Sequence, residues 1–121
     1  PRGRCGDRVR DPHLSEEASV IQELRIYRFH PGQKKTFLKE FRKARLFMKK
    51  YGVTFVAAWE NPDRDDEFIW MRSFADAKAR EKAIEAYYGS PEWLKIVGRI
   101  RPTIRRREVR VMKELKVPAR G

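Results

Sequence analysis

The chain has 121 residues, which is the length of a single domain with one core. Hydrophobic residues make up 40% and charged residues 38%, so the composition indicates a folded protein with a highly charged surface rather than a disordered chain. No apolar stretch approaches the roughly 20 residues of a membrane-spanning helix, which excludes a spanning protein. The single cysteine, Cys5, cannot form an internal disulfide, and no zinc-binding or phosphate-loop pattern is present. We therefore expect a cytoplasmic protein that holds no metal and no cofactor.

The chain is strongly basic, because 29 Lys and Arg residues outnumber 17 Asp and Glu residues and give a net charge of +12. Residues 34–50 contain eight basic side chains and one acidic side chain, Glu40, and residues 99–120 are similarly basic. Such a charge favours acidic partners: an anionic ligand, an anionic lipid or a nucleic acid. Runs of charge are usually solvated faces, and neither exposed aromatic residues nor a recognition helix is evident. Nucleic acid is therefore the less favoured partner.

The first half of the chain is predicted to contain a leader, a strand and a helix. Residues 1–18 show no hydrophobic periodicity and are expected to be a flexible leader. Residues 20–29 alternate as a strand, in which Leu24 and Ile26 share one face. Apolar residues then recur at steps of three and four, which predicts a helix over residues 34–51 with a basic outer face.

The second half is predicted to begin with a hairpin. Residues 54–60 and 68–74 have the composition of strands, and the polar residues 61–66 form the turn between them. A helix follows over residues 76–88, with Asp76 as its N-cap, and Ser90-Pro91 starts a shorter helix that ends before Pro102.

A final strand is predicted over residues 103–115, and the element order is then β-α-β-β-α-β. This order is that of an α+β, ferredoxin-like fold: a four-stranded antiparallel sheet with two helices on one face. The domain is expected to cover residues 19–115 and to be followed by a tail at residues 116–121. Because the strands carry apolar residues on both sides, a second subunit should cover the other face, which predicts a homodimer.

Several strings, in their order and spacing, resemble the NIPSNAP family of the dimeric α+β barrel superfamily over residues 20–114. The strings are Glu23-Leu24-Arg25-Ile26-Tyr27 with Pro31-Gly32, Ser73-Phe74-Ala75-Asp76, Ser90-Pro91-Glu92-Trp93 and Ile100-Arg101-Pro102. The resemblance implies a homodimer of two packed sheets and a pocket between sheet and helices in each protomer. In the wider superfamily such pockets serve cofactor-free monooxygenases, lyases, haem enzymes and binding proteins, so the resemblance specifies the fold better than the function.

One strand carries the candidate catalytic residues. Glu23, Arg25 and Tyr27 share a strand face, and a carboxylate, a guanidinium and a phenol together could hold an anion or transfer a proton. The same three residues could instead form an ion pair and hydrogen bond that fix the register or close the dimer. His30, at the end of this strand, is a candidate base at the pocket mouth or an exposed loop histidine.

The candidate ligand-binding residues are Trp59, Trp70, Arg72 and Tyr87. Aromatic walls with one cation suit a flat anionic or phenolic ligand, although ordinary core or dimer packing explains the same residues. In a ferredoxin-like sheet the first strand pairs with the third, so Tyr27 and Trp70 can be cross-strand neighbours. The sequence leaves open whether they face the helices or a partner's sheet.

Three functions follow from these patterns. The first is a protein that binds a small hydrophobic or anionic molecule, as a cofactor-independent oxygenase, isomerase or cyclase acting on an aromatic or polyketide-like compound. The second is a dimeric binding or scaffold protein without catalytic activity. The third is a module that binds anions or nucleic acid through its basic surface.

Overall fold

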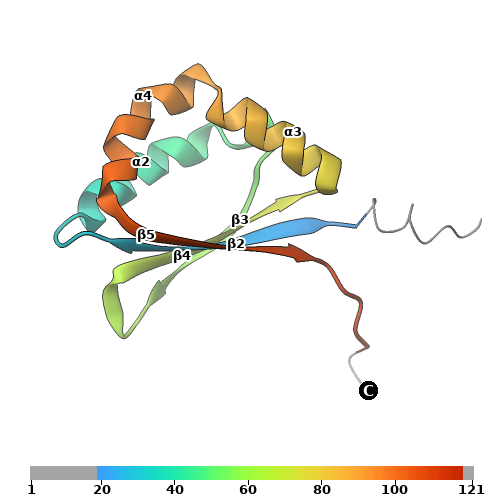
Figure 1. Cartoon of the computed structure of the whole chain (residues 1–121), viewed down its shortest axis with the longest axis horizontal. Coiled ribbons are helices and arrows are strands. Elements are labelled where there is room, and N and C mark those ends of the chain that lie inside the picture. The colour runs from blue at the N-terminus through green and yellow to red at the C-terminus, as the bar shows by residue number, and fades with distance from the viewer. Residues whose placement is uncertain (1–18, 119–121) are drawn as a thin grey trace, which may run out of the picture.

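The computed structural model describes residues 19–118, and the predicted leader at residues 1–18 lies outside the described residues, as do residues 119–121. Helices cover one face of a single sheet, and the other face is bare (Figure 1). The elements in chain order are β2 (Ile21–Phe29), α2 (Lys34–Leu46), a 3-10 turn (Lys49–Tyr51), β3 (Thr54–Asn61), β4 (Arg64–Phe74), α3 (Ala77–Tyr88), α4 (Pro91–Ile100), a second 3-10 turn (Arg101–Thr103) and β5 (Ile104–Lys113).

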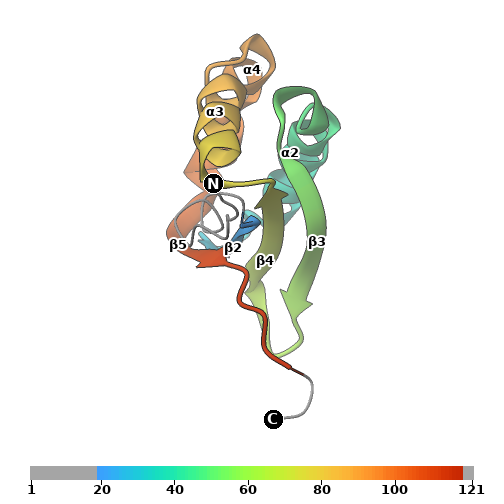
Figure 2. The same cartoon turned by 90° about the vertical axis from the view of Figure 1, so that its right-hand side faces the viewer.

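The strand order of the sheet is β3-β4-β2-β5, and β2 pairs antiparallel with both of its neighbours. The predicted ferredoxin-like α+β fold is thereby confirmed, including the pairing of the first strand with the third. Three helices lie on the covered face, and the third of them, α4, is the shorter helix predicted to start at Ser90-Pro91. Figure 2 shows this helical layer above the sheet, with the chain after β5 leading away from the helices.

The predicted caps of the last two helices are confirmed. The Asp76 side chain accepts a hydrogen bond from the backbone N–H of Ala79 at 2.8 Å, and Ser90 Oγ accepts one from Trp93 N–H at 3.1 Å. Each cap satisfies a backbone donor that the first turn of a helix leaves without a partner. Both helices therefore start at the expected residues.

Two predicted boundaries were wrong. The helix predicted over residues 34–51 ends at Leu46, because the chain tightens into the 3-10 turn before Gly52, whose φ of +89° suits glycine. β4 begins at Arg64 rather than Phe68, because Asn61 and Arg64 already pair across the hairpin and only two residues separate the strands. Polar residues at an exposed strand end do not show the alternation by which a strand is predicted.

The core lies between α2 and the covered face of the sheet. Phe37 has no exposed surface, and its ring centre lies 4.8 Å from that of Phe29, 5.0 Å from that of Phe68 and 5.5 Å from that of Phe41. The central position of this ring follows from the spacing of apolar residues on α2, which directs Phe37 and Phe41 at the sheet.

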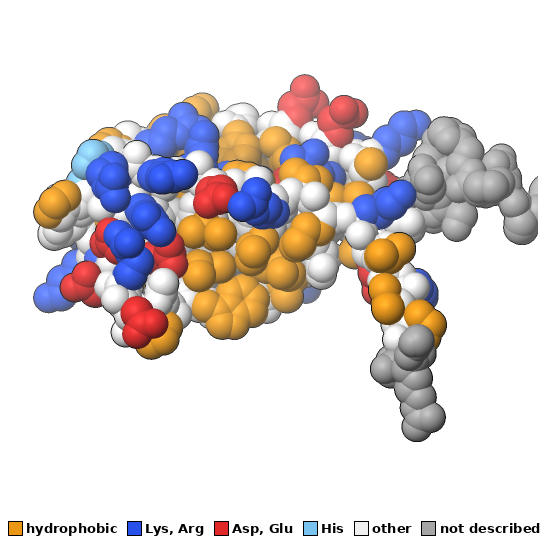
Figure 3. Space-filling model, turned by 60° about the horizontal axis from the view of Figure 1, so that its bottom comes forward, with side chains coloured by type: hydrophobic (Ala, Val, Ile, Leu, Met, Phe, Trp, Pro, Cys, Tyr) orange, Lys and Arg blue, Asp and Glu red, His pale blue; other side chains and the backbone are white. Residues whose placement is uncertain are grey.

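The bare face is apolar at its centre (Figure 3). Strand pairing places Leu24 opposite Met71 and Ile26 opposite Ile69, and Trp59 of β3 lies beside Ile69. These side chains point away from the helices, and 46% of the Trp59 surface is exposed. The helices among the described residues are too short and too polar for any of them to cross a membrane.

Replacing Phe37 with alanine should lower the free energy of unfolding by about 3–5 kcal/mol, because the missing ring leaves a cavity among four others. Urea denaturation measures the change. Leu46→Ala on the same helix is the control, since Leu46 is 86% exposed and its loss should change stability by less than about 0.5 kcal/mol. Equal effects of the two changes would contradict the placement of the core.

Candidate ligand site

The site is built on the alternation of β2 and β4. Glu23, Arg25 and Tyr27 occupy the positions of β2 that face the helices, and their burial shows it. In the pairing of β2 with β4, Glu23 lies opposite Arg72, and Arg25 lies opposite Trp70. Five predicted site residues on two strands, Tyr27 included, are therefore brought together under the helical layer. The direct partner of Tyr27 is Phe68, so Tyr27 and Trp70 are diagonal neighbours rather than a facing pair.

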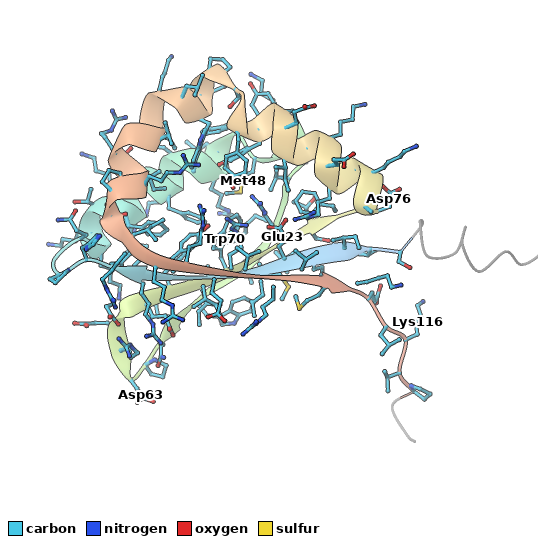
Figure 4. All side chains as sticks on the ribbon, in the orientation of Figure 1. Glu23, Met48, Asp63, Trp70, Asp76 and Lys116 are labelled. Atoms are coloured by element: carbon cyan, nitrogen blue, oxygen red, sulfur yellow. The ribbon has the colours of Figure 1, made fainter. Side chains whose placement is uncertain are left out.

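A buried carboxylate holds three guanidinium groups at the end of the site nearest α3 (Figure 4). Glu23 has no exposed surface. Its Oε1 accepts hydrogen bonds from Arg25 Nη1 at 2.7 Å and Arg72 Nε at 2.8 Å, while its Oε2 accepts one from Arg80 Nε at 2.6 Å. Arg25 and Arg72 are themselves buried, whereas the Arg80 side chain is 32% exposed. We call these four residues the guanidinium cluster.

The guanidinium cluster contains two more positive charges than negative ones. Burial alone would raise the pKa of Glu23, but the charge and hydrogen bond of Arg72, the hydrogen bond of Arg80 and the charge of Arg25 hold that pKa below its usual value. Glu23 is consequently ionised at neutral pH and a weak proton acceptor. The excess charge leaves the buried site electrostatically attractive to an anion.

Two phenols extend the cluster towards the aromatic core. Arg25 Nε donates to Tyr27 Oη at 2.8 Å, and Arg72 Nη1 donates to Tyr88 Oη at 2.9 Å. Burial alone would lower the pKa of Arg25, but its oxygen-bearing neighbours, Tyr27 first among them, raise it above the ordinary value. The Arg25 guanidinium is therefore charged at every physiological pH, and its orientation is fixed from both sides.

A cavity of about 40 Å³ lies between the sheet and the helices beside Arg25. A space of this size holds about three water molecules or one small polar group. Its lining is Arg25, Tyr27, Phe37, Phe41, Ala44, Met48, Trp70, Tyr87, Tyr88, Trp93, Ile100, Arg101, Ile104 and Arg107. Of these, Arg101 and Arg107 are exposed, which places the mouth of the cavity beside β5 and the turn before it. No carboxylate lines it, and three guanidinium groups do.

Trp70 supplies an unpaired donor at this cavity. The Trp70 side chain is 2% exposed, and its Nε1 is the one buried side-chain nitrogen or oxygen of residues 19–118 without a hydrogen-bond partner. An indole N–H can only donate, so it requires an acceptor. A buried donor without an acceptor costs on the order of 1–3 kcal/mol, which an oxygen atom in the cavity would recover.

Tyr87 and Arg72 also lie at the site. Tyr87 lines the cavity, and its hydroxyl donates to the Ala44 carbonyl at 3.2 Å. Burial raises the pKa of this phenol, so Tyr87 is neutral and serves as a wall rather than as a base. Arg72 does not line the cavity but orients Glu23 and Tyr88.

Trp59 and His30 lie outside the cavity. Trp59 pairs with Ile69 whereas Trp70 pairs with Ala58, so the two indoles occupy opposite faces of the sheet. An irregularity between Phe55 and Ala57 causes this, because it reverses the alternation along β3. His30 is exposed in the loop after β2, where its backbone N–H donates to the Thr103 carbonyl at 3.0 Å.

The sequence predictions omitted several residues of the site. Arg80 is one turn after the cap of α3, and no hydrophobic pattern signals that it turns towards β2. Trp93 was predicted to be a core residue, and it is buried, but it also lines the cavity. Arg101 and Arg107 were interpreted only as part of a basic run. Only the pairing of Arg107 with Tyr27 could have assigned it to the cavity.

Residues 19–118 contain no group of three histidine, cysteine or acidic side chains that could hold a metal ion. The polar side chains at the site are guanidinium cations and hydrogen-bond donors, and the positive charge repels a metal ion. The chemistry open to the site is the binding and polarisation of an electron-rich organic group.

Comparison with known proteins identifies the family of this sequence. The sequence model of the NIPSNAP family matches residues 22–118. A NIPSNAP family protein of unknown function from Agrobacterium tumefaciens superimposes with a TM-score of 0.72 at 20% identity, over 84% of this chain and 94% of that chain. No curated protein sequence matches the chain.

Two structures named for oxygenases share the fold. A putative antibiotic biosynthesis monooxygenase from Chloroflexus aurantiacus gives a TM-score of 0.64 at 15% identity, over 85% of this chain and 100% of that chain. A variant of SnoaB, a cofactor-independent oxygenase from Streptomyces nogalater, also gives 0.64 at 15% identity, over 84% and 99%. At such identities the likeness extends to the fold alone.

Replacing Glu23 with glutamine should destabilise the protein by about 3–5 kcal/mol at neutral pH, because two buried guanidinium groups then lose their counter-charge. The folded state depresses the Glu23 pKa, so the unfolded chain takes up the proton first as the pH falls. The stabilisation is complete above the unfolded pKa of about 4.3 and disappears as the pH falls through the folded one. Urea denaturation between pH 7 and pH 3 measures both effects.

The control is Glu60→Gln, which removes the carboxylate of an exposed pair with Lys34 and should have a much smaller effect. The Glu23→Gln protein should lose less stability than the parent as the pH falls, because the contribution of the Glu23 carboxylate is already absent. A Glu23→Gln protein as stable as the parent at pH 7 would show that the guanidinium cluster does not depend on its carboxylate.

Proposed function

The chain belongs to the NIPSNAP family, and from the charge and lining of its cavity we propose that it binds a small aromatic molecule carrying an acidic group. The single observation that carries this proposal is the lining of the cavity, where three guanidinium groups, including Arg25 of the guanidinium cluster, face no carboxylate. A buried excess of positive charge is costly unless an anion shares the site. The ligand's acidic group would supply that anion.

The cavity walls favour an aromatic body for this ligand. Side chains of Tyr27, Trp70, Tyr88 and Trp93 line the space, and aromatic faces stack well with flat rings. The enclosed volume of about 40 Å³ suits the acidic group, which would lie against the Arg25, Arg101 and Arg107 guanidinium groups that line it. The ring would extend from there between the aromatic walls towards the mouth. The indole N–H of Trp70 would donate to an oxygen of the acidic group.

Cofactor-independent oxygenation is the second candidate function, and the enclosed cationic cavity favours it. In such a reaction the substrate's own carbanion reacts with oxygen, and it must form in a site that excludes water. The Arg25 guanidinium would stabilise the resulting enolate. Glu23 has both oxygens occupied and His30 lies outside the cavity, so Tyr27 is the member of the predicted catalytic set best placed to exchange a proton.

Binding of matched pairs of aromatic carboxylic acids and their primary amides tests the proposal by calorimetry. The acids should bind more tightly than the amides, and Arg107→Gln should weaken acid binding by roughly 1.5–3 kcal/mol, because it removes one of the three charged donors that line the cavity. The amides should be little affected.

Arg105→Gln on the same strand is the matched control, since Arg105 does not line the cavity. It should leave both affinities unchanged. Acids and amides that bind equally, or an Arg105→Gln effect as large as that of Arg107→Gln, would refute a cation-lined binding site.

We also propose that the protein acts as a homodimer in which two bare sheet faces pack together. The apolar centre of that face, formed by Leu24, Ile26, Ile69, Met71 and Trp59, supports this arrangement. A stable interface of standard size buries about 1,600 Å² in total, which a four-stranded face can provide.

Ile69→Arg should therefore convert a dimer into monomers, because it places a charge at the centre of an apolar interface. Sedimentation equilibrium measures the mass. Leu46→Arg makes the same change on the helical side and should leave the dimer intact. A parent protein that sediments as a monomer at tens of micromolar would refute the homodimer.

A further inference from the structure

The outer surface of the helical layer exposes two large aliphatic side chains. Leu46 of α2 is 86% exposed and Leu94 of α4 is 62% exposed. A single exposed leucine is ordinary on a protein surface. These two are notable because of where they lie relative to each other and because of the charges around them.

α2 and α4 are antiparallel neighbours, which brings the two leucines level. Glu40 Oε1 of α2 lies 3.3 Å from Arg99 Nε near the end of α4, and Lys50 Nζ lies 2.8 Å from Glu92 Oε2 near its start. Residue pairs thus run in opposite directions along the two helices, and both Leu46 and Leu94 lie between these two ion pairs along the chain. Both leucines point away from the core, because other residues of the two helices, among them Ala44 and Trp93, are the buried ones.

Uncompensated cations surround the leucines. Residues 34–50 and 91–100 together contain ten basic and two acidic side chains. Both acids are already neutralised, Glu40 by Lys43 and Arg99, and Glu92 by Lys50. The exposed residues of this surface, which we call the outer helix face, are Lys35, Lys39, Arg42, Arg45, Leu46, Lys49, Leu94 and Lys95.

A groove beside Leu46 is lined by the cations Arg42, Arg45 and Lys49, and Val53 and Phe55 contribute apolar surface to it. Its volume is about 670 Å³ and it opens widely to solvent. The Arg45 guanidinium lies 4.1 Å from the centre of the Phe55 ring, which holds it at the groove's edge. Such a groove can accept an anionic headgroup next to an apolar chain.

We propose that the outer helix face binds the surface of an anionic lipid bilayer. The cations would contact lipid phosphates and carboxylates, and Leu46 and Leu94 would enter the boundary between headgroups and acyl chains. A nucleic acid would use the cations but would gain nothing from the leucines, and this face presents no exposed aromatic side chain for base stacking. A bilayer uses both the cations and the leucines, whereas a nucleic acid uses the cations alone.

Co-sedimentation with vesicles tests the proposal. The full chain should bind phosphatidylcholine vesicles containing about 30% phosphatidylserine, and should not bind pure phosphatidylcholine, at about 0.1 M salt. Lys39→Gln with Arg42→Gln should weaken binding about thirtyfold, since each basic residue near an anionic surface contributes about a factor of five. Leu46→Ser with Leu94→Ser should weaken binding even at low salt.

Lys78→Gln with Lys82→Gln is the matched control, because both residues are exposed on α3 and the double change removes the same charge. It should leave vesicle binding nearly unchanged, and circular dichroism verifies that every variant is folded. Three results would overturn the proposal: no binding to the anionic vesicles, equal losses in the test and control pairs, or leucine variants that bind as well as the parent. A short DNA duplex that displaces the protein from vesicles without any dependence on the leucines would indicate nucleic acid instead.

Discussion

The buried carboxylate of Glu23 determines the arrangement of the rest of the site. It accepts hydrogen bonds from guanidinium groups on β2, β4 and α3. These contacts join the centre of the sheet to the helix above it, and they hold Arg25 and Arg72 where their remaining donors reach Tyr27 and Tyr88. Without the carboxylate the same positions would contain only repelling cations. One group therefore accounts both for the alignment of α3 over the sheet and for the positive charge beside the cavity.

The two sides of the molecule have opposite surface character. The bare sheet face is apolar at its centre (Figure 3), whereas the outer helix face combines six basic side chains with two leucines. The cavity lies between these layers and opens beside β5. The bare sheet face, the outer helix face and the cavity are thus spatially separate. A substitution in one of them removes no direct contact from the other two.

Local patterns explain why much of this fold could be predicted from the sequence. The alternation of β2 identified Glu23, Arg25 and Tyr27 as one face, and the caps Asp76 and Ser90 located two helix starts. What could not be predicted depends on pairing between distant segments. An irregularity in β3 sends Trp59 to the bare face, and only the register of β5 against β2 brings Arg107 to the cavity. The periodicity of a single sequence reveals neither the irregularity in β3 nor the register of β5.

The position of β2 has a consequence for how the protein folds. β2 is first among the described strands, yet it pairs along its whole length with β5, the last of them, so that Ile21 lies opposite Lys113. Contacts between such distant segments slow folding, because a long loop must close before they form. During synthesis β2 emerges before its partner on that side exists. The edge of β2 that pairs with β5 must therefore stay solvated or shielded until β5 is made, and the cavity, which Ile104 and Arg107 of β5 help to line, is completed last.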